Sequence, residues 1–478
     1  MTSYQSPCFP FPEKYKMNMF TEIWKRKSNR PLYAFFLTLS ICIQCSLAFG
    51  EKSSGESRLS PDLQTKMEDI IKTDSHRIET IFKDIHQNPE LGFIEVRTAG
   101  IIRDELLSLG FEVNSGIGKT GVLAILRNGE GPTVLYRADM DANAVEETTN
   151  LAYASTVRVT MADGKEVPVA HMCGHDAHVS WMLGMAHTMV ELKSQWSGTL
   201  VLIGQPAEEL IAGAAAMIED GLYARYNMPK PDYMVALHSV PIALGTIVNA
   251  GGVRYAGTDQ LDVTFFGIGG HGSMPQNTKD PVLMAATAVT QYQSIISRNI
   301  DPQDAAVLTV GSIQAGSDNN VIPDKALLKI NLRWFSEPVR QQLLSGIKKI
   351  NRSIAMAQGV SEERMPTILM KGYSTPLVND SALMTRLTDS FSVVLSEYII
   401  IENAPSAMAS EDAHILLGAY TDVPLAYIML GVASPKAFMD AGNKPPYFNH
   451  NGDYKVELEA IPFGTRVAST AVMELLAL

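Results

Sequence analysis

Cysteine is scarce in this chain. The 478 residues contain 4 cysteines, and Cys8, Cys42 and Cys45 all lie within the first 50 positions. If that segment is removed during maturation, Cys173 remains as the one thiol and no intramolecular disulfide can form. A small scaffold held by disulfides is thereby excluded. A lone thiol in an oxidising compartment also needs protection, which a bound metal would provide.

Positive charge is also in short supply. Lys and Arg number 39 against 51 Asp and Glu, so the formal net charge is -12 at pH 7. A nucleic-acid partner needs a basic surface to neutralise its phosphates, and the composition argues against one. Hydrophobic residues make up 46% of the chain, which is enough for a sizeable core, and the length suggests two or three domains.

Two motifs of common enzyme classes are missing or incomplete. No G-x-S-x-G elbow occurs, so a serine hydrolase of the α/β type is not expected. Residues 267–272 fit the G-x-G-x-x-G pattern of dinucleotide-binding loops. However, no helix opens at this loop and no acidic residue follows about 20 positions later, so nucleotide binding is not expected.

The N-terminal 50 residues have the composition of a targeting segment. A basic stretch at 25–30 precedes an uncharged, mostly apolar run at 31–50 that ends in small residues. These are the parts of a secretory signal peptide, and they predict a secreted or periplasmic protein; the alternative is an uncleaved membrane anchor. Residues 1–16 resemble an overhang, with Met17 or Met19 as candidate starts. Removing the segment takes away a net of four positive charges and leaves -16.

The stretch from His171 to His178 concentrates metal-binding side chains. It offers three imidazoles, a thiol and a carboxylate within eight positions. Borderline metals such as zinc bind sulfur and imidazole nitrogen, and harder ones such as manganese prefer carboxylate. We interpret the stretch as half of a metal site. The alternative is a loop with a buried cysteine and solvated histidines.

The apolar pattern of the chain indicates an α/β fold. Short, almost continuous apolar runs are typical of strands in a sheet that is covered on both faces. Segments with helical periodicity separate these runs, and the predicted helices are 61–85, 98–109, 177–192, 212–220, 381–396 and 458–476. The simplest architecture is a mixed sheet flanked by helices.

Three predicted strands run directly into polar side chains. Residues 133–136 lead to Asp139 and Asp141, 199–203 lead to Glu208 and Glu209, and 233–237 lead to His238. Open α/β sheets bind ligands at the carboxyl ends of their strands. We therefore expect these side chains to share one crevice.

Between residues 253 and 371 the pattern changes to half-solvated strands and two helices. The predicted elements, in the order β-α-β-β-α-β, are 261–266, 281–297, 305–313, 326–334, 337–357 and 366–371. This order is that of a ferredoxin-like α+β unit, so we expect a small domain inserted in a larger one. The predicted boundaries are 1–50 for the leader, 51–65 for a linker, 66–252 and 372–478 for the larger domain, and 253–371 for the inserted domain.

The side chains gathered by these segments suggest a metal site. The candidate ligands, with Asp139 and Asp141 close by, are Cys173, His175, Glu209, His238 and His450. Each is weak evidence alone, because a histidine at a strand end is often structural and a Glu-Glu pair can form a solvated turn. Paired glutamates nevertheless suit a metal-dependent hydrolase, since one carboxylate binds metal while its neighbour takes a proton from the activated water.

A series of short segments carries a family resemblance. They are 86–92 (HQNPELG), 137–142 (RADMDA), 173–178 (CGHDAH), 205–209 (QPAEE), 237–238 (LH), 269–275 (GGHGSMP), 320–323 (NVIP) and 410–412 (SED). With these segments in this order, the chain resembles the M20 metallopeptidase family from about Ile70 to its C-terminus. Within the family it resembles the amidohydrolase branch, which contains hippurate hydrolases, N-acyl-amino-acid amidohydrolases and plant auxin-conjugate hydrolases.

The resemblance implies a role for each matching residue. The ligands of two divalent ions, with Mn²⁺ or Zn²⁺ expected, would be Cys173, His175, Glu209, His238 and His450. Glu208 would be the general base and then the acid, and His271 from the inserted domain would reach toward the oxyanion. Supporting positions would be Asp139, Asp141 and Asn320. The family also implies a homodimer that forms through the inserted domain.

Two sites depart from the family pattern. Asn143 and Ala144 stand where the family usually has Leu-Pro, and Ala409 and Ala413 stand where glycine and an aromatic residue are common. Both sites are candidates for lining the substrate pocket. They therefore bear on the acyl preference and not on the chemistry.

The predicted function is hydrolysis of the amide bond of an N-acyl or N-aroyl amino acid, a small-molecule substrate, by metal-activated water. One alternative is a metallo-aminopeptidase or carboxypeptidase that acts on short peptides. Another is a catalytically silent binding protein on the same fold. The intact Glu208 argues against a silent protein, because a binder needs no free base beside a ligand carboxylate.

Overall fold

The computed structural model describes residues 57–478, so the predicted leader lies outside the described residues. Helix α2 (Pro61–Gln87) begins inside the segment predicted as a linker. It starts there because the Ser60 hydroxyl accepts a hydrogen bond from the backbone N–H of Leu63 and a proline occupies the first turn. Within residues 57–478, no helix is both long enough and apolar enough to cross a bilayer.

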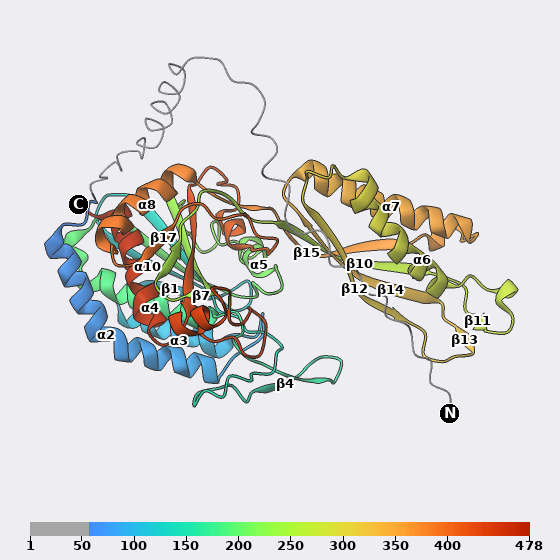
Figure 1. Cartoon of the computed structure of the whole chain (residues 1–478), viewed down its shortest axis with the longest axis horizontal. Coiled ribbons are helices and arrows are strands. Elements are labelled where there is room, and N and C mark those ends of the chain that lie inside the picture. Colours follow the sequence, from blue (N-terminus) through green and yellow to red (C-terminus); the bar gives the residue numbers. More distant parts are fainter. Residues whose placement is uncertain (1–56) are drawn as a thin grey trace, which may run out of the picture. The chain divides into compact units, whose positions relative to one another are not determined.

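An eight-stranded mixed sheet organises the larger part of the structure (Figure 1). In spatial order its strands are β1 (Glu112–Ile117), β2 (Gly121–Asn128), β6 (Gly198–Gln205), β3 (Thr133–Asp139), β7 (Tyr233–Ala243), β18 (Leu425–Ala433), β8 (Thr246–Val248) and β17 (Ile399–Ile401). The central strands β6, β3, β7 and β18 run parallel, whereas β1 and β2 pair antiparallel with their neighbours. The predicted α/β class with a mixed sheet is confirmed.

Helices cover both faces of this sheet because its strands are apolar on both sides. Val134 and Tyr136 of β3 face a core built with α2, α3 (Val96–Ser108), α4 (His175–Glu191), α8 (Ser381–Val394) and α10 (Ala460–Leu476). Leu135, on the opposite side of the pleat, packs in a second core with α5 (Gly213–Glu219) and the 3₁₀ turn Ala413–Leu417. Helix α4 is buried almost all round, as its apolar sequence requires.

A separate four-stranded antiparallel sheet is formed by the segment between the two halves of the large sheet. Its order is β12 (Ala306–Ala315), β14 (Lys325–Trp334), β10 (Gly257–Phe266) and β15 (Thr367–Ser374). Helices α6 (Pro281–Ser294) and α7 (Glu337–Ala357) pack on it and share one hydrophobic cluster with it. This arrangement is the predicted ferredoxin-like unit; the domain boundaries stay a prediction.

Several short elements were not predicted from the sequence. They are the hairpin of β4 (Arg158–Thr160) and β5 (Glu166–Pro168), the pair β9 (Gly252–Tyr255) and β16 (Leu377–Asn379), the pair β11 (Gly270–His271) and β13 (Val321–Ile322), and helix α9 (Pro435–Asp440). Their two to six residues are too few to show a periodicity.

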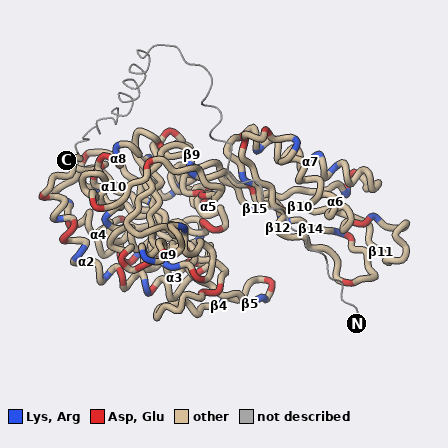
Figure 2. The backbone as a smooth tube through the Cα atoms, in the orientation of Figure 1, with Lys and Arg blue, Asp and Glu red and all other residues tan. Residues whose placement is uncertain are grey.

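Charged residues of both signs alternate along the outer helix α2 (Figure 2). Two of its pairs, Lys66 with Asp62 and Lys83 with Glu79, have the i,i+4 spacing. Exposed pairs of this kind contribute only about 0.3–0.5 kcal/mol each. The helix therefore presents a mixed surface and not the continuous basic stripe that a nucleic acid would need.

Candidate metal centre and active site

Helix α4 begins at the point where two candidate ligands lie. It starts at His175, two residues earlier than predicted, so His175 lies in the first turn and Cys173 directly precedes the N-cap. The cap is Gly174, with φ +82°. A Cβ atom there would lie 2.3 Å from the Ser239 hydroxyl. Only glycine fits both the left-handed backbone and this close approach, which fixes the spacing of the two ligands.

The structure brings the predicted ligands together from separate elements. Ligand atoms of Cys173, His175 and Glu209 all lie within 4.8 Å of one another. The Sγ atom of Cys173 is 3.7 Å from Nε2 of His238, and Nε2 of His450 is 3.1 Å from Oε1 of Glu209. All five side chains therefore meet at the carboxyl edge of the large sheet.

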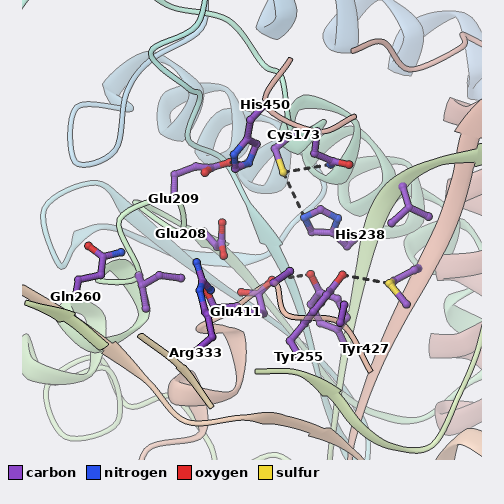
Figure 3. Close-up of a pocket in the computed structure, with 17 residues that line it drawn as sticks. Cys173, Glu208, Glu209, His238, Tyr255, Gln260, Arg333, Glu411, Tyr427 and His450 are labelled. Carbon is purple, nitrogen blue, oxygen red and sulfur yellow. Dashed lines mark hydrogen bonds and ion pairs between the residues drawn. The ribbon is translucent and has the colours of Figure 1, made fainter. Parts of the chain in front are cut away.

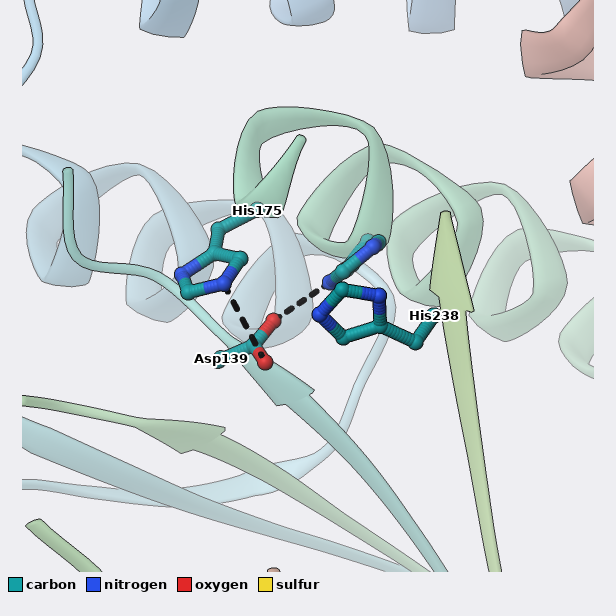
Figure 4. A group of neighbouring side chains, drawn as sticks. Asp139, His175 and His238 are labelled. Carbon is teal, nitrogen blue, oxygen red and sulfur yellow. Dashed lines mark hydrogen bonds and ion pairs between the residues drawn. The ribbon is translucent and has the colours of Figure 1, made fainter. Parts of the chain in front are cut away.

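The two strand-end aspartates flank His175. Oδ2 of Asp139 is 3.6 Å from Nε2 of His175 (Figure 4). On the other side of the ring, Oδ1 of Asp141 is 3.3 Å from Nδ1. Both nitrogens of this fully buried ring lack a well-formed hydrogen bond within residues 57–478. A buried imidazole in that position suits coordination to a metal ion.

The tautomers of two nearby histidines follow from their backbone partners. Nδ1 of His238 donates to the carbonyl of Ser239 at 2.8 Å, so the Nε2 lone pair faces Cys173 and is available to a metal. His178 differs. Its Nε2 accepts the backbone N–H of Ser239 at 2.8 Å and its Nδ1 donates to Asp139 at 2.5 Å. His178 is therefore a support for Asp139, and both of its nitrogens are used.

Neighbouring charges favour the forms of two ligands that bind metals. Burial alone would raise the pKa of the Cys173 thiol, but His238 and His175 lower that pKa to about 6. Burial opposes ionisation of Glu209 as well, yet the hydrogen bond from His450 and the charge on His175 lower its pKa to about 2. A thiolate, imidazoles and a carboxylate form a donor set that fits a divalent ion of the zinc or manganese type.

Glu208 is held differently from its neighbour. It is buried, and one carboxylate oxygen from each of Glu208, Glu411 and Asp412 lies within 4.8 Å of the other two. Burial and the adjacent acids Glu411 and Glu209 raise its pKa well above the usual value. A carboxyl group in such surroundings is suited to holding and releasing a proton.

A buried arginine organises the acids behind the site. Arg137 donates to Asp139, Gln205 and Glu411, each at 2.7 Å. The Tyr427 hydroxyl donates to the second oxygen of Glu411 at 2.6 Å. The network fixes Asp139 on one side and Glu411 on the other, so the carboxylates around the site have little freedom to rotate.

Residues 135–474 match the sequence family described as Peptidase family M20/M25/M40. The chain belongs to this family. Two relatives support its amidohydrolase branch. A hippurate hydrolase of Campylobacter jejuni is 39% identical over 284 residues, which are 59% of this chain and 70% of the relative. The Arabidopsis thaliana protein IAA-amino acid hydrolase ILR1-like 4 is 32% identical over 407 residues, which are 83% of this chain and 86% of the relative.

A solved M20 structure agrees with the fold and with the metal chemistry. A Bacillus subtilis protein described as a dinuclear metal-binding peptidase from the M20 family matches with a TM-score of 0.63 and 26% identity. The match covers 84% of this chain and 99% of that one. The predicted family and branch are confirmed, and the chain is a metal-dependent hydrolase that acts on amide bonds.

The M20 site opens into a cavity of about 440 Å³ (Figure 3). Its apolar lining residues are Ile211, Val240, Tyr255, Ala407, Ala409, Tyr427 and Met429. Ala409 therefore lies where the departure from the family pattern suggested. The other departures do not: Ala413 is fully buried in the core around α5, and neither Asn143 nor Ala144 lines the cavity.

Arg333 of β14 is a site residue that the sequence did not reveal. It lines the cavity with Gln260 of β10, and Figure 3 shows its guanidinium reaching toward Glu208. Its Nε donates to Asn331 at 2.8 Å, whereas its buried Nη1 has no hydrogen-bond partner in the described part of the chain. In the sequence Arg333 is an alternating polar position on a half-solvated strand, so nothing distinguishes it from a surface residue.

Two residues of the predicted M20 site do not reach the cavity. His271 and Asn320 are exposed at the β11–β13 pair, where the Ser273 hydroxyl is 2.8 Å from Nδ1 of His271. Neither residue lines the cavity of the same chain. The expected role of His271 at the oxyanion therefore stays a prediction, because the β11–β13 pair that carries this residue does not line the cavity of the same chain.

Proposed function

We propose that this chain hydrolyses the amide bond of N-acyl amino acids, with the scissile bond bound between the metal donors and Glu208. One observation supports this proposal most directly. A buried carboxyl group, Glu208, stands beside a thiolate, imidazole and carboxylate donor set, and a guanidinium, Arg333, faces it across the same cavity.

The residues that would hold a pair of divalent ions are Cys173, His175, Glu209, His238 and His450. Their donor types fit Zn²⁺ or Mn²⁺, and the buried, unsatisfied imidazole of His175 supports this assignment. When bound, such ions polarise the amide carbonyl and lower the pKa of water. Asp139 and Asp141 would act indirectly, by orienting His175.

Glu208 would move the proton in this reaction. Its neighbour Glu209 faces the donor set, which leaves the Glu208 carboxylate free to accept a proton from the attacking water. The same carboxyl group would then deliver that proton to the amine of the departing amino acid. Burial keeps the group out of bulk water, so the proton is retained between the two steps.

The two ends of the cavity would hold the two halves of the substrate. A guanidinium with an unsatisfied nitrogen suits the carboxylate of the amino acid, so we assign that carboxylate to Arg333. The wall that includes Tyr255, Tyr427 and Met429 would hold the acyl group. A volume of about 440 Å³ suits a small molecule of this size.

We further propose that the chain forms a homodimer through the four-stranded sheet. Exposed apolar side chains on its edge strand β15 support this, namely Leu369 at 58% exposure and Met370 at 41%. His271, which lies outside its own cavity, would then be available to a second copy. Light scattering of the purified protein tests the stoichiometry.

Secretion or a periplasmic location remains a proposal that rests on the composition of residues 1–50, with the uncleaved membrane anchor as its alternative. The N-terminal sequence of the mature protein tests it. A start near residue 51 supports cleavage, and a start near residue 17 supports the anchor.

A substrate panel tests the proposed function. The protein, loaded separately with Mn²⁺ and Zn²⁺, is assayed on hippurate, on N-acetyl amino acids and on dipeptides, with a chelator-treated sample as the control. We expect the acyl amino acids to be hydrolysed faster than the dipeptides, and only by the loaded protein. Faster cleavage of dipeptides would assign the site to a peptidase, and no turnover in any arm would favour the silent binding protein.

A further inference from the structure

The turn that carries Glu208 and Glu209 has a strained backbone. Ala207 has φ +47° and Ile211 has φ +51°, both in the left-handed region that favours glycine. This conformation is rare for alanine and rarer still for a β-branched residue. Two such residues bracket the glutamate pair, and strain of this kind persists only where the surrounding structure holds it in place.

The turn is packed backbone against backbone. A Cβ atom on Gly213 would lie 1.5 Å from the carbonyl oxygen of Pro206, so the two ends of the turn can approach only through glycine. A Cβ atom on Gly92 would lie 3.0 Å from Cα of Ala207. The loop before α3 is therefore in direct contact with the turn, although more than 100 positions separate them in the sequence.

Two buried carboxylates hold three consecutive backbone N–H groups of the turn. Glu95 accepts the N–H of Ala207 at 2.8 Å. Asp141 accepts the N–H of Glu208 at 3.1 Å and that of Glu209 at 3.0 Å. Glu95 and Asp141 are 0% and 1% exposed, so water does not compete for these bonds.

Glu95 is anchored on its other side by Thr120, whose hydroxyl donates to Oε2 at 2.5 Å. Glu95 neither lines the cavity nor belongs to the groups of metal-binding side chains. Asp141 is different, because it also lies 3.3 Å from His175. A change at Glu95 therefore perturbs the turn without removing a metal donor, a donor's direct neighbour or a substrate contact.

We propose that Glu95 is a positioning residue of the active site, which fixes the N–H of Ala207 so that Glu208 faces the cavity while Glu209 faces Cys173 and His175. This inference rests on the proposed function for the role of Glu208. Without the bond from Ala207, the strained turn relaxes and the two carboxylates lose their separate directions. Both proton transfer and metal affinity then suffer, whereas substrate binding at Arg333 does not.

The same loop offers a matched control. The carboxylate of Glu90 accepts the backbone N–H groups of Arg97 and Thr98, at 2.9 and 2.8 Å, and so caps the start of α3. Glu90→Leu makes the same chemical change as Glu95→Leu and perturbs the same loop, but the Glu90 side chain makes no bond to the turn. A purely structural role of the loop would affect both variants alike.

The test compares Glu95→Leu, Thr120→Val and Glu90→Leu in the metal-loaded protein. The measurements are kcat and KM on the best acyl amino acid of the panel, the Zn²⁺ dissociation constant by chelator competition, and Tm. For Glu95→Leu, which removes the acceptor of the Ala207 N–H, we expect kcat to fall and Zn²⁺ to bind more weakly, each about 10–100-fold, with KM changed by no more than about twofold. Thr120→Val should act in the same direction with a smaller effect, and Glu90→Leu should lower Tm alone.

Equal effects of Glu95→Leu and Glu90→Leu on kcat and Zn²⁺ affinity would overturn the proposal. If Glu95→Leu does not fold, Thr120→Val takes its place in that comparison. A wild-type protein without turnover would reject the proposed function. The Zn²⁺ affinities would then still decide whether Glu95 positions the turn.

Discussion

Buried carboxylates have opposite surroundings in the two sheets. In the four-stranded sheet, Asp259 is fully buried, and each of its two oxygens has a partner, so we call it the matched acid. Arg340 lies 2.8 Å from one of its oxygens, and the indole N–H of Trp334 donates to the other at 2.8 Å. This acid is a structural pair, and it is surrounded by the partners that a buried charge requires.

The edge of the eight-stranded sheet has a surplus of acids. Its buried or partly buried carboxyl groups are Asp139, Asp141, Glu208, Glu209, Glu411 and Asp412. Among the described residues, Arg137 is the one arginine that pairs directly with members of this group. Burial and the charge of Glu411 raise the pKa of Asp412 to about 8, so that part of the excess is held as protons. The paired acid Asp259 therefore has a structural role, whereas the surplus of acids at the edge of the eight-stranded sheet favours the binding of cations.

Removing a surplus acid should abolish catalysis and spare the fold. Glu208→Gln is expected to lower kcat about 10²–10⁴-fold, because the proton carrier is lost while every metal donor remains. Metal content and Tm should stay at the wild-type values, since one of several like charges has been removed. Steady-state kinetics and metal analysis check this, and retained turnover would reject the assigned base.

Removing the partner of the matched acid should have the reverse effect. Arg340→Met is expected to lower the free energy of unfolding by about 3 kcal/mol, because Asp259 stays buried without its counter-charge. Turnover below the melting transition should be unchanged. Denaturant titration measures the loss. Lys349→Met, at an exposed position on the same helix, is the control and should be nearly neutral. A neutral Arg340→Met would show that the pair is not a structural one.

Replacing the Cys173 thiol tests whether the edge of the eight-stranded sheet binds a metal ion through this residue. Cys173→Ser is expected to weaken metal binding about 10–100-fold, since a soft, ionised ligand is exchanged for a hydroxyl. Chelator competition and metal analysis after dialysis measure the change. Metal retention equal to that of the wild type would count against a thiolate ligand.

The smallest effect is expected for Arg333, a residue of the four-stranded sheet that lines the cavity. Arg333→Met should raise KM about tenfold, because a charge-assisted hydrogen bond to the substrate carboxylate is lost. Arg333→Lys keeps the positive charge but loses the planar guanidinium that can bind both carboxylate oxygens, so its KM should lie between those of the wild type and Arg333→Met. The control is an N-acyl amino acid amide, which lacks the carboxylate and should not distinguish Arg333→Met from the wild type. If the KM for this amide differs between Arg333→Met and the wild type, Arg333 does not act by binding the substrate carboxylate.

The meeting of the candidate metal donors in one place could be predicted from the sequence, because few residue types bind metals. Cys173, His175 and Glu209 carry donor atoms that bind metals, and the ends of parallel strands meet at one edge whatever the details of the sheet. The helix 337–357 was also predicted to the residue, since its apolar positions recur with a clear period.

Residues that act through their location in space were not visible in the sequence. Arg333 has the pattern of an ordinary solvent-facing strand position, and Glu95 that of a residue before a helix. Their importance arises from a neighbouring cavity and from the N–H of Ala207, neither of which leaves a periodic signal. The catalytic role of His271 stays a prediction for a related reason, because a motif specifies a loop sequence and not the cavity toward which the β11–β13 pair extends.

The contribution of Arg333 from β14 has an evolutionary consequence. The proposed metal donors and proton carrier lie at the eight-stranded sheet, and the group assigned to the amino-acid end of the substrate lies on the four-stranded sheet. We therefore expect mutations in the four-stranded sheet to change which compound is selected while the proposed hydrolytic residues stay intact. A lineage with this arrangement can change its substrates while it keeps the same hydrolytic reaction.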